Sequence, residues 1–316
     1  MTCQQYNNLK LFAGNSNPEL AHEISSILAI PLGKAKAAKF SDGEINVTVG
    51  ETVRGSDCYI IQSTCDPVND NLMELLIMID AMKRASAGRI NAVIPFFGYA
   101  RQDRKAKARD PISAKLVANL LESAGADRVI TMDLHAMQIQ GFFDIPVDHL
   151  QGRPVLAEYY TEKKADDIVI VSPDHGGVVR ARYMAEMLEC PIAIVDKRRP
   201  APNQSEVMNV IGDVKDKNCI ILDDMIDTAG SITNAANAIK KLGAKNVYVA
   251  VTHGVLSGPA IERLENSVIE EVIILNTIPL TDEKKKSTKI KTLSVAPIFA
   301  ESIRRIHNNE PLSVMF

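Results

Sequence analysis

Residues 223–231 read DDMIDTAGS, directly after the apolar run Cys219 to Leu222 and directly before a stretch of helical pattern. This order predicts a buried strand that ends in paired carboxylates and turns through small residues into a helix. Carboxylates accept hydrogen bonds from sugar hydroxyls, and the N–H groups and dipole of a helix N-terminus attract a phosphate. We therefore expect Asp223 and Asp224 to bind a ribose diol, and the amides of Thr228 to Ser231 to bind a terminal phosphate.

The same segment has a plainer interpretation. Asp227 or Ser231 could be the N-cap of the following helix, as in many strand–turn–helix units. The rest of the sequence has to decide between a ligand site and a structural turn.

Length and composition limit the classes of protein to consider. A chain of 316 residues predicts two domains of about 150 residues each. The net charge of -3 gives no general attraction for nucleic acid or for an anionic membrane, so neither is expected as a partner. Five widely spaced cysteines, with no C-x-x-C pair, indicate reduced thiols and a cytoplasmic protein. No apolar run is long enough for a membrane helix.

Two segments of the chain resemble each other without a gap, Ser113 to His135 and Ser231 to His253. The coinciding pairs are Ser113/Ser231, Ala118/Ala236, Asn119/Asn237, Gly125/Gly243, Ala126/Ala244, Val129/Val247 and His135/His253. Each segment reads as a helix, a Gly-Ala stop and a β-branched strand, which is one αβ step of a parallel sheet. Duplication explains the match; the alternative is punctuation that αβ units share by chance.

Strand-like and helical patterns alternate along the whole chain, which predicts an α/β protein of two duplicated domains. Each domain would be a mainly parallel sheet flanked by helices. The join is expected after residues 142–146, FFDIP, giving domains 1–147 and 148–316. In the first half the positions that match the acidic loop, residues 105–112, read KAKARDPI. The carboxylate pair is missing there, so this half has a degenerate sugar loop.

A second candidate phosphate loop, SPDHGG, follows the strand-like run 168–171. Gly176 and Gly177 permit close approach of the backbone to a diphosphate, and Asp174 can hold the Mg²⁺ that accompanies it. The alternative is a glycine-rich turn in which Asp174 is a cap.

A basic segment, DKRRP, follows the run Ile192 to Val195 and has the composition of an exposed loop. Lys197 and Arg199 could neutralise charge at a phosphoryl centre, or could be ordinary surface charge. In the first half, FSDGE at 40–44 suits a nucleobase and YARQDRK at 99–105 offers donors to phosphates. Taken singly, both fit a turn and a solvated basic face equally well.

These motifs together resemble ribose-phosphate diphosphokinase, also called phosphoribosyl pyrophosphate synthetase, in its common bacterial and animal class. FSDGE, YARQDRK, the MDLHAMQIQGFFDIPVDHL stretch, VSPDHGGVVRAR, DKRRP and DDMIDTAGS occur in the family's order over nearly the whole chain. The resemblance implies two domains of phosphoribosyltransferase type. It also implies transfer of the diphosphoryl group of MgATP to the anomeric hydroxyl of ribose 5-phosphate, giving 5-phosphoribosyl 1-diphosphate and AMP for nucleotide biosynthesis.

The same resemblance assigns the site residues. It implies that ATP is bound by Phe40, Asp42, Gly43, Glu44, Arg101 and Gln102. It implies that ribose 5-phosphate is bound by Arg199, Asp223, Asp227, Thr228, Ala229, Gly230 and Ser231. Under it, His135 and Asp174 are ligands of Mg²⁺, the one cofactor, and Lys197 and Arg199 are the catalytic pair.

Members of this class form homohexamers, in which the FSDGE loop reaches a neighbour's ATP site, and respond to ADP and inorganic phosphate. The resemblance therefore implies a regulatory anion site at Thr52, Arg54, Ser86, Arg109, Ser313 and Phe316. Thr52 and Pro311 stand where the family usually has serine. ADP inhibition is for that reason a weaker implication than catalysis.

Three rival functions fit part of the sequence. A phosphoribosyltransferase shares the acidic loop but has no use for FSDGE and YARQDRK. A catalytically silent, nucleotide-binding regulatory homologue would not need Lys197, Arg199, Asp174 and His135 intact. A transcription factor that reads DNA with residues 101–109 conflicts with the interleaved Asp103 and with the acidic total charge.

Overall fold

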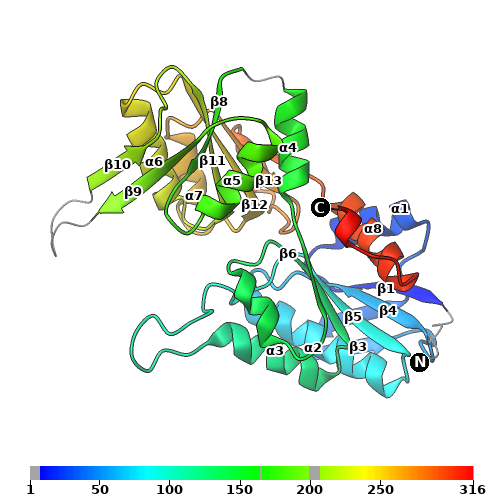
Figure 1. Ribbon diagram of the computed structural model, residues 1–316. Helices are drawn as coiled ribbons and strands as arrows, with labels where there is room; N and C mark the ends of the chain where they lie inside the picture. The colour runs from blue at the N-terminus through cyan, green and yellow to red at the C-terminus, as the bar shows by residue number, and fades with distance from the viewer. Residues whose placement is uncertain (1–7, 164–165, 199–206, 316) are drawn as a thin grey trace. The chain divides into compact units, whose positions relative to one another are not determined.

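The computed structural model describes residues 8–163, 166–198 and 207–315, and the chain forms two compact units (Figure 1). Unit 1 comprises Met1–Gln151, Thr277–Pro279 and Ser294–Phe316. Unit 2 comprises Gly152–Asn276 and Leu280–Leu293. The predicted ranges 1–147 and 148–316 differ from this division at three places, because residues 148–151, 277–279 and 294–316 belong to unit 1. Residue 147 begins strand β7 (Val147–Leu150), which pairs with β6 of unit 1, and the C-terminal residues pack with unit 1.

Unit 1 is built on a parallel sheet of order β1-β4-β5-β6-β7. Its strands besides β7 are β1 (Leu9–Ala13), β4 (Asp57–Ile61), β5 (Arg89–Ile94) and β6 (Arg128–Met132). An antiparallel hairpin, β2 (Ala35–Lys39) and β3 (Ile45–Val49), stands outside this sheet. The helices are α1 (Pro18–Leu28), α2 (Val68–Arg84), α3 (Ser113–Ala124), α8 (Ala296–His307) and the short 3₁₀ turns η1 (Met137–Phe142) and η3 (Ser313–Met315).

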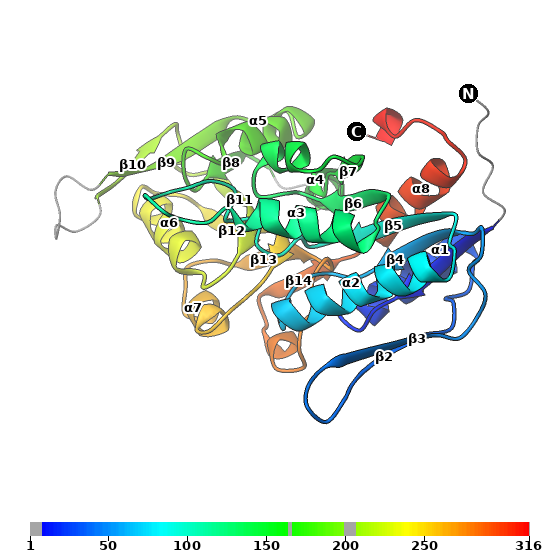
Figure 2. The same cartoon turned by 90° about the horizontal axis from the view of Figure 1, so that it is seen from below.

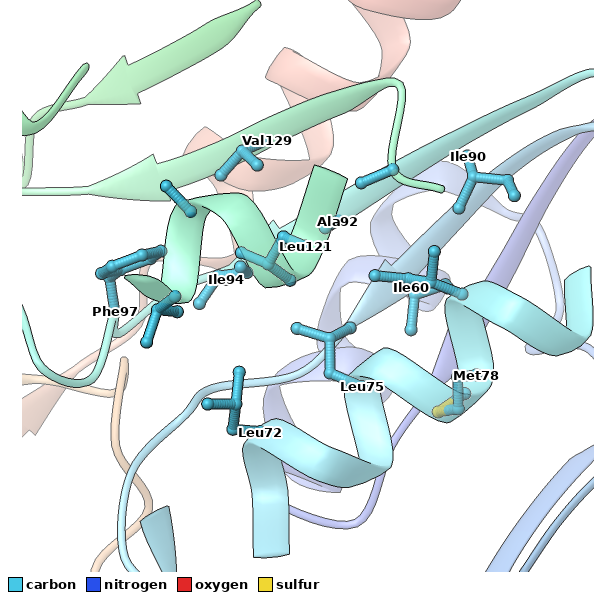
Figure 3. Packing of buried hydrophobic residues seen from close by; sticks show 14 of the residues in the cluster. Ile60, Leu72, Leu75, Met78, Ile90, Ala92, Ile94, Phe97, Leu121 and Val129 are labelled. Atoms are coloured by element: carbon cyan, nitrogen blue, oxygen red, sulfur yellow. The ribbon is translucent and has the colours of Figure 1, made fainter. Parts of the chain in front are cut away.

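Helices α2 and α3 lie side by side along one face of this sheet (Figure 2). Leu75 of α2 and Leu121 of α3 face Ile60 of β4 and Ile94 of β5, and all four side chains are fully buried (Figure 3). Each such burial is worth about 1.5–3 kcal/mol relative to exposure. On the other face α1 packs against α8, so elements from the N-terminal and C-terminal parts of the chain meet within unit 1.

Unit 2 is built on a sheet of order β10-β9-β8-β11-β12-β13-β14, in which only the β9–β10 pair is antiparallel. Its strands are β8 (Ile168–Ser172), β9 (Ile192–Arg198), β10 (Val207–Ile211), β11 (Asn218–Ile226), β12 (Asn246–Gly254), β13 (Glu271–Leu275) and β14 (Ile290–Leu293). Its helices are α4 (Arg153–Glu162), α5 (Val178–Met187), α6 (Gly230–Lys241), α7 (Ala260–Glu265) and the 3₁₀ turn η2 (Lys284–Lys286).

The duplicated step of the sequence appears as a helix and a strand in each unit, α3–β6 and α6–β12. In both, the helix gives way to the strand at a glycine with positive φ, Gly125 at 118° and Gly243 at 94°. A side chain would be strained in that left-handed conformation, which explains why both copies have glycine there. The prediction of an α/β fold with mainly parallel sheets flanked by helices is confirmed.

Two strands are longer than the sequence predicted. Strand β11 continues past Leu222 to Ile226 and carries the acidic pair, because β12 pairs with it as far as Gly254. Strand β9 continues through Arg198, because β10 folds back antiparallel along it. The first residues of DKRRP are therefore strand residues and not part of an exposed loop.

Candidate active site

Three motif segments of unit 2 lie at one edge of its sheet. Strands β9, β8 and β11 are adjacent and parallel, so their carboxyl ends lie together. DKRRP begins at Asp196 inside β9, the SPDHGG loop follows β8, and the acidic segment ends β11, so the described parts of these three motifs are neighbours. Ligands of open α/β sheets bind at this kind of edge.

The acidic pair at the end of β11 differs in exposure. The side chain of Asp223 is 23% exposed, whereas that of Asp224 is 5% exposed. Asp223 is accordingly the carboxylate that a sugar can reach, and Asp224 lies behind it. Burial, followed by the neighbouring charge of Asp224, raises the pKa of Asp223 to about 8.

A counter-ion, Arg180 of α5, accompanies this pair. Its Nη1 donates to Asp223 Oδ1 at 3.2 Å and lies 3.5 Å from Asp224 Oδ1. The positive charge of the guanidinium partly offsets the effect of burial, so the pKa of Asp223 rises less than burial alone would raise it. The sequence suggested no specific partner for Arg180, because its contacts depend on how α5 packs against β11.

The backbone of the candidate phosphate loop, residues 227–231, accepts hydrogen bonds from residues that follow strand β12. The Asp227 carbonyl accepts from the Ser257 amide at 3.0 Å, and Arg263 Nη1 donates to the Thr228 carbonyl at 2.9 Å. Ala229 has a left-handed backbone, with φ 62°. These contacts use carbonyl groups of the loop, and helix α6 begins within it, at Gly230.

The structural alternative for this loop is not supported. Helix α6 has Ala229 as its N-cap residue and no side-chain cap, so neither Asp227 nor Ser231 is the N-cap. The first amides of a helix have no acceptor within the helix. Gly230, Ser231 and Ile232 supply such amides at the end of α6 that also carries the positive end of the dipole. This arrangement can bind a phosphate.

The SPDHGG loop is a compact turn. Ser172 Oγ donates to the Asp174 carbonyl at 2.6 Å, and the Gly177 amide donates to Asp174 Oδ1 at 3.0 Å. A Cβ at residue 177 would lie 2.8 Å from Ser172 Oγ, so only glycine fits. The alternative that Asp174 stabilises a glycine-rich turn is correct as far as this contact goes. The carboxylate is nevertheless exposed and can also bind a cation.

A contact that the sequence did not indicate joins this turn to β9. His175 Nε2 lies 2.9 Å from Asp196 Oδ1, and Asp196 is buried. The link fixes the SPDHGG turn beside the strand that leads into Lys197. DHGG follows β8 and DKRRP begins inside β9, but only the sheet order makes these two strands neighbours.

The candidate catalytic pair is described only in part. The backbone of Lys197 lies in β9 opposite Met208 of β10. Arg199 lies outside the described residues. Both residues come shortly after Asp196 in the sequence, and Asp196 is in contact with His175.

The two candidate Mg²⁺ ligands lie in different units. Asp174 follows β8 of unit 2, and His135 follows β6 of unit 1, where it is exposed. Among the described residues no three His, Cys, Asp or Glu side chains form a metal-binding group. Mg²⁺ commonly takes one or two carboxylates and completes its shell with water and substrate phosphates, and the exposed carboxylate of Asp174 suits that mode.

The predicted ATP residues of unit 1 come from two loops. FSDGE is the tip of the β2–β3 hairpin, where the Phe40 amide donates to the Glu44 carbonyl at 2.8 Å. Gly43 has φ 94°, and the Phe40 side chain is 54% exposed. The turn interpretation is thus correct for its backbone, and the tip also presents an aromatic ring together with Asp42 and Glu44 on the surface.

Arg101 and Gln102 line a cavity of about 510 Å³ at the carboxyl edge of the unit 1 sheet. The segment after β4 forms the other wall, and the lining residues there are Asp66, Pro67, Val68, Asn69 and Asp70. Lys39, at the end of β2, pairs with Asp70 at 2.5 Å and ties the hairpin to this wall. No sequence motif pointed to the segment 66–70, which becomes part of the cavity because β4 and β5 are adjacent.

The implied regulatory residues are only partly assembled within one chain. Arg54 and Ser86 lie side by side, since the Gly55 amide donates to the Ser86 carbonyl at 2.8 Å and Arg54 bridges to Ala87. The Thr52 carbonyl accepts from Lys10. Within the described parts of unit 1, no hydrogen bond joins these residues to Arg109 or Ser313. Phe316 lies outside the described residues.

No helix in the described part of the chain is both long and apolar enough to cross a membrane. Two family models match the sequence. Residues 9–125 match the N-terminal domain of ribose phosphate pyrophosphokinase, and residues 195–316 match the phosphoribosyl synthetase-associated domain.

Similar proteins cover almost the whole chain. A ribose-phosphate pyrophosphokinase of Clostridium perfringens is 69% identical over 312 residues, which are 98% of this chain and 98% of that protein. One from Bacillus subtilis is 61% identical over 309 residues, covering 98% and 97%. The crystal structure of phosphoribosylpyrophosphate synthetase from Mycobacterium smegmatis matches with a TM-score of 0.91 and 48% identity, over 96% of this chain and 100% of that one.

Proposed function

Because this chain belongs to the ribose-phosphate pyrophosphokinase family, we propose that it makes 5-phosphoribosyl 1-diphosphate and AMP from MgATP and D-ribose 5-phosphate. The chain is then a diphosphotransferase that serves nucleotide biosynthesis. The observation that carries the proposal is the end of β11, where a reachable carboxylate stands next to a helix start that no side chain caps.

That arrangement supports a site for a phosphorylated sugar. Asp223 would accept hydrogen bonds from the ribose hydroxyls, and the amides of 228–231 would bind the 5-phosphate. Asp227 and Arg199 complete the proposed set for ribose 5-phosphate. No side chain caps α6, so its first amides are available to a phosphate.

In the proposed reaction the anomeric oxygen attacks the β-phosphorus of ATP. The bond from that oxygen to phosphorus forms as the bond from the β-phosphorus to the α,β-bridging oxygen breaks. AMP leaves with the bridging oxygen, and the hydroxyl proton is released. Lys197 and Arg199 would neutralise the charge that develops on the transferred group, and no covalent enzyme intermediate is needed.

Mg²⁺, when bound, would neutralise phosphate oxygens and orient the diphosphoryl group. Asp174 and His135 are the residues proposed to hold it. The SPDHGG turn keeps Asp174 at the surface through Ser172 and Gly177, and the diphosphate would approach the turn at its two glycines.

ATP is proposed to bind unit 1 at the cavity lined by Arg101 and Gln102. Guanidinium and carboxamide groups can donate to phosphates there. In the proposed homohexamer the exposed ring of Phe40 can stack on the adenine bound to a neighbouring subunit, and Asp42, Gly43 and Glu44 share its turn.

Two further proposals concern the oligomeric state and the regulation of the enzyme. We propose a homohexamer that responds to ADP and inorganic phosphate through Thr52, Arg54, Ser86, Arg109, Ser313 and Phe316. The meeting of Arg54 with Ser86 in one chain supports the first part of that site. A cytoplasmic location stays a prediction.

One assay tests the main proposal. The protein is mixed with MgATP and ribose 5-phosphate, and AMP is measured, with D-ribose as the matched sugar without phosphate. AMP that forms only with ribose 5-phosphate supports the synthetase. No AMP at any phosphate concentration would favour the silent homologue, and release of pyrophosphate from 5-phosphoribosyl 1-diphosphate with a free base would favour a phosphoribosyltransferase.

A further inference from the structure

Arg180 stands between the two loops of unit 2 that are proposed to bind the sugar and the diphosphate. On one side it contacts Asp223 and Asp224 of β11, at 3.2 Å and 3.5 Å. On the other side its Nη1 lies 3.9 Å from the position that a Cβ at residue 177 would take. Its side chain is 24% exposed, so the guanidinium is held by the two carboxylates yet open to a ligand.

We propose that Arg180 is a positioning residue that favours the ionised form of Asp223 and aims its carboxylate at the ribose diol, an inference that rests on the proposed function. Among the described residues, Arg180 is the cation that contacts Asp223. Arg180 would act through Asp223 and not on the reacting atoms.

The reason is electrostatic. Two adjacent carboxylates repel each other when both are ionised, and burial also disfavours the ionised form. In the part of the chain that the structure describes, the charged groups that act on Asp223 are Asp224 from its own strand and Arg180 from α5, and strand β12 places the apolar Val251 opposite it. An ionised carboxylate is a stronger acceptor for a hydroxyl than its protonated form. Loss of Arg180 would therefore leave Asp223 protonated over a wider range of pH.

The test measures the dissociation constant of ribose 5-phosphate by calorimetry between pH 7.5 and 9.5. The substrate's phosphate, with a second pKa of about 6, is already a dianion there. For Arg180→Gln we expect affinity about tenfold weaker than the parent at pH 7.5 and within about twofold at pH 9.5, since one pKa unit corresponds to tenfold in ionisation. Arg180→Lys keeps the charge and should follow the parent's pH curve.

Arg182→Gln is the matched control, because it makes the same change on the same helix at an exposed residue that is not assigned to the site. It should bind like the parent at every pH. If Arg180→Gln weakens binding by the same factor at all pH values, or does not weaken it, the proposal is overturned. Arg180→Met replaces it should Arg180→Gln fail to fold. A parent protein that does not bind ribose 5-phosphate would instead reject the proposed function.

Discussion

An ionised Asp223 can bind a ligand, but its partly buried charge makes the folded state less stable. Its pKa is raised to about 8, so between the ordinary value of 3.8 and about 8 the folded state binds more protons than the unfolded state. Stability therefore falls as pH rises through this window. We predict that Asp223→Asn removes this dependence on pH. The free energy of unfolding of the variant, minus that of the parent, should therefore increase with pH by at most about 1.4 kcal/mol per pH unit.

The measurement is urea unfolding without ligand at pH 5 and pH 8. Asp216→Asn, in an exposed turn, controls for the loss of an acidic side chain. A difference between Asp223→Asn and the parent that is equal at both pH values would mean that Asp223 is ionised throughout.

Lys197 belongs to the same scale, as a single charge proposed to act in the transition state. We predict that Lys197→Ala lowers kcat at least about a hundredfold with little change in substrate affinity. Steady-state kinetics with MgATP and ribose 5-phosphate measure this. A change confined to KM would show that Lys197 binds the substrates' ground state and does not stabilise the transition state.

At the scale of elements, the start of α6 separates binding from stability. An acidic residue in the first turn stabilises a helix by about 0.3–1 kcal/mol, because it meets the positive end of the dipole. A phosphate at the same place would be repelled. We predict that Ser231→Asp leaves the protein as stable or slightly more stable, while ribose 5-phosphate binds at least about tenfold more weakly.

Thermal unfolding and calorimetry measure the two effects of Ser231→Asp separately. Asn237→Asp makes the same kind of change farther along α6, also at an exposed residue, and should leave binding intact. Unchanged binding of ribose 5-phosphate to Ser231→Asp would place the phosphate elsewhere.

At the scale of the whole molecule, the C-terminal helix is anchored by a buried charge in unit 1. Asp57 is fully buried and is bound by Arg89 at 2.7 and 2.5 Å, by Asn91 at 2.8 Å and by His307 of α8 at 2.8 Å. Burial would raise the pKa of Asp57, but Arg89 and then His307 outweigh it and hold it below 3.8. A contact across 250 residues thus attaches α8 to β4.

We predict that Asp57→Ala destabilises unit 1 by about 3–5 kcal/mol, because Arg89 is left buried without its partner. Urea unfolding measures the loss. Asp80→Ala, which breaks the exposed pair with Arg84, should change stability little. A small effect of Asp57→Ala would show that Arg89 finds water or another acceptor.

The sequence alone determined the family, the α/β class, the duplicated αβ step and the loops that carry the candidate site. Periodicity, glycine punctuation and short charged motifs act over a few residues, so they can be seen without the fold. Only the tertiary structure decided that Arg180 meets Asp223, that His175 holds Asp196, that segment 66–70 lines a cavity and that α8 belongs to unit 1. Each of these joins residues from separate elements, and such contacts depend on which strands are neighbours and how the helices pack across them.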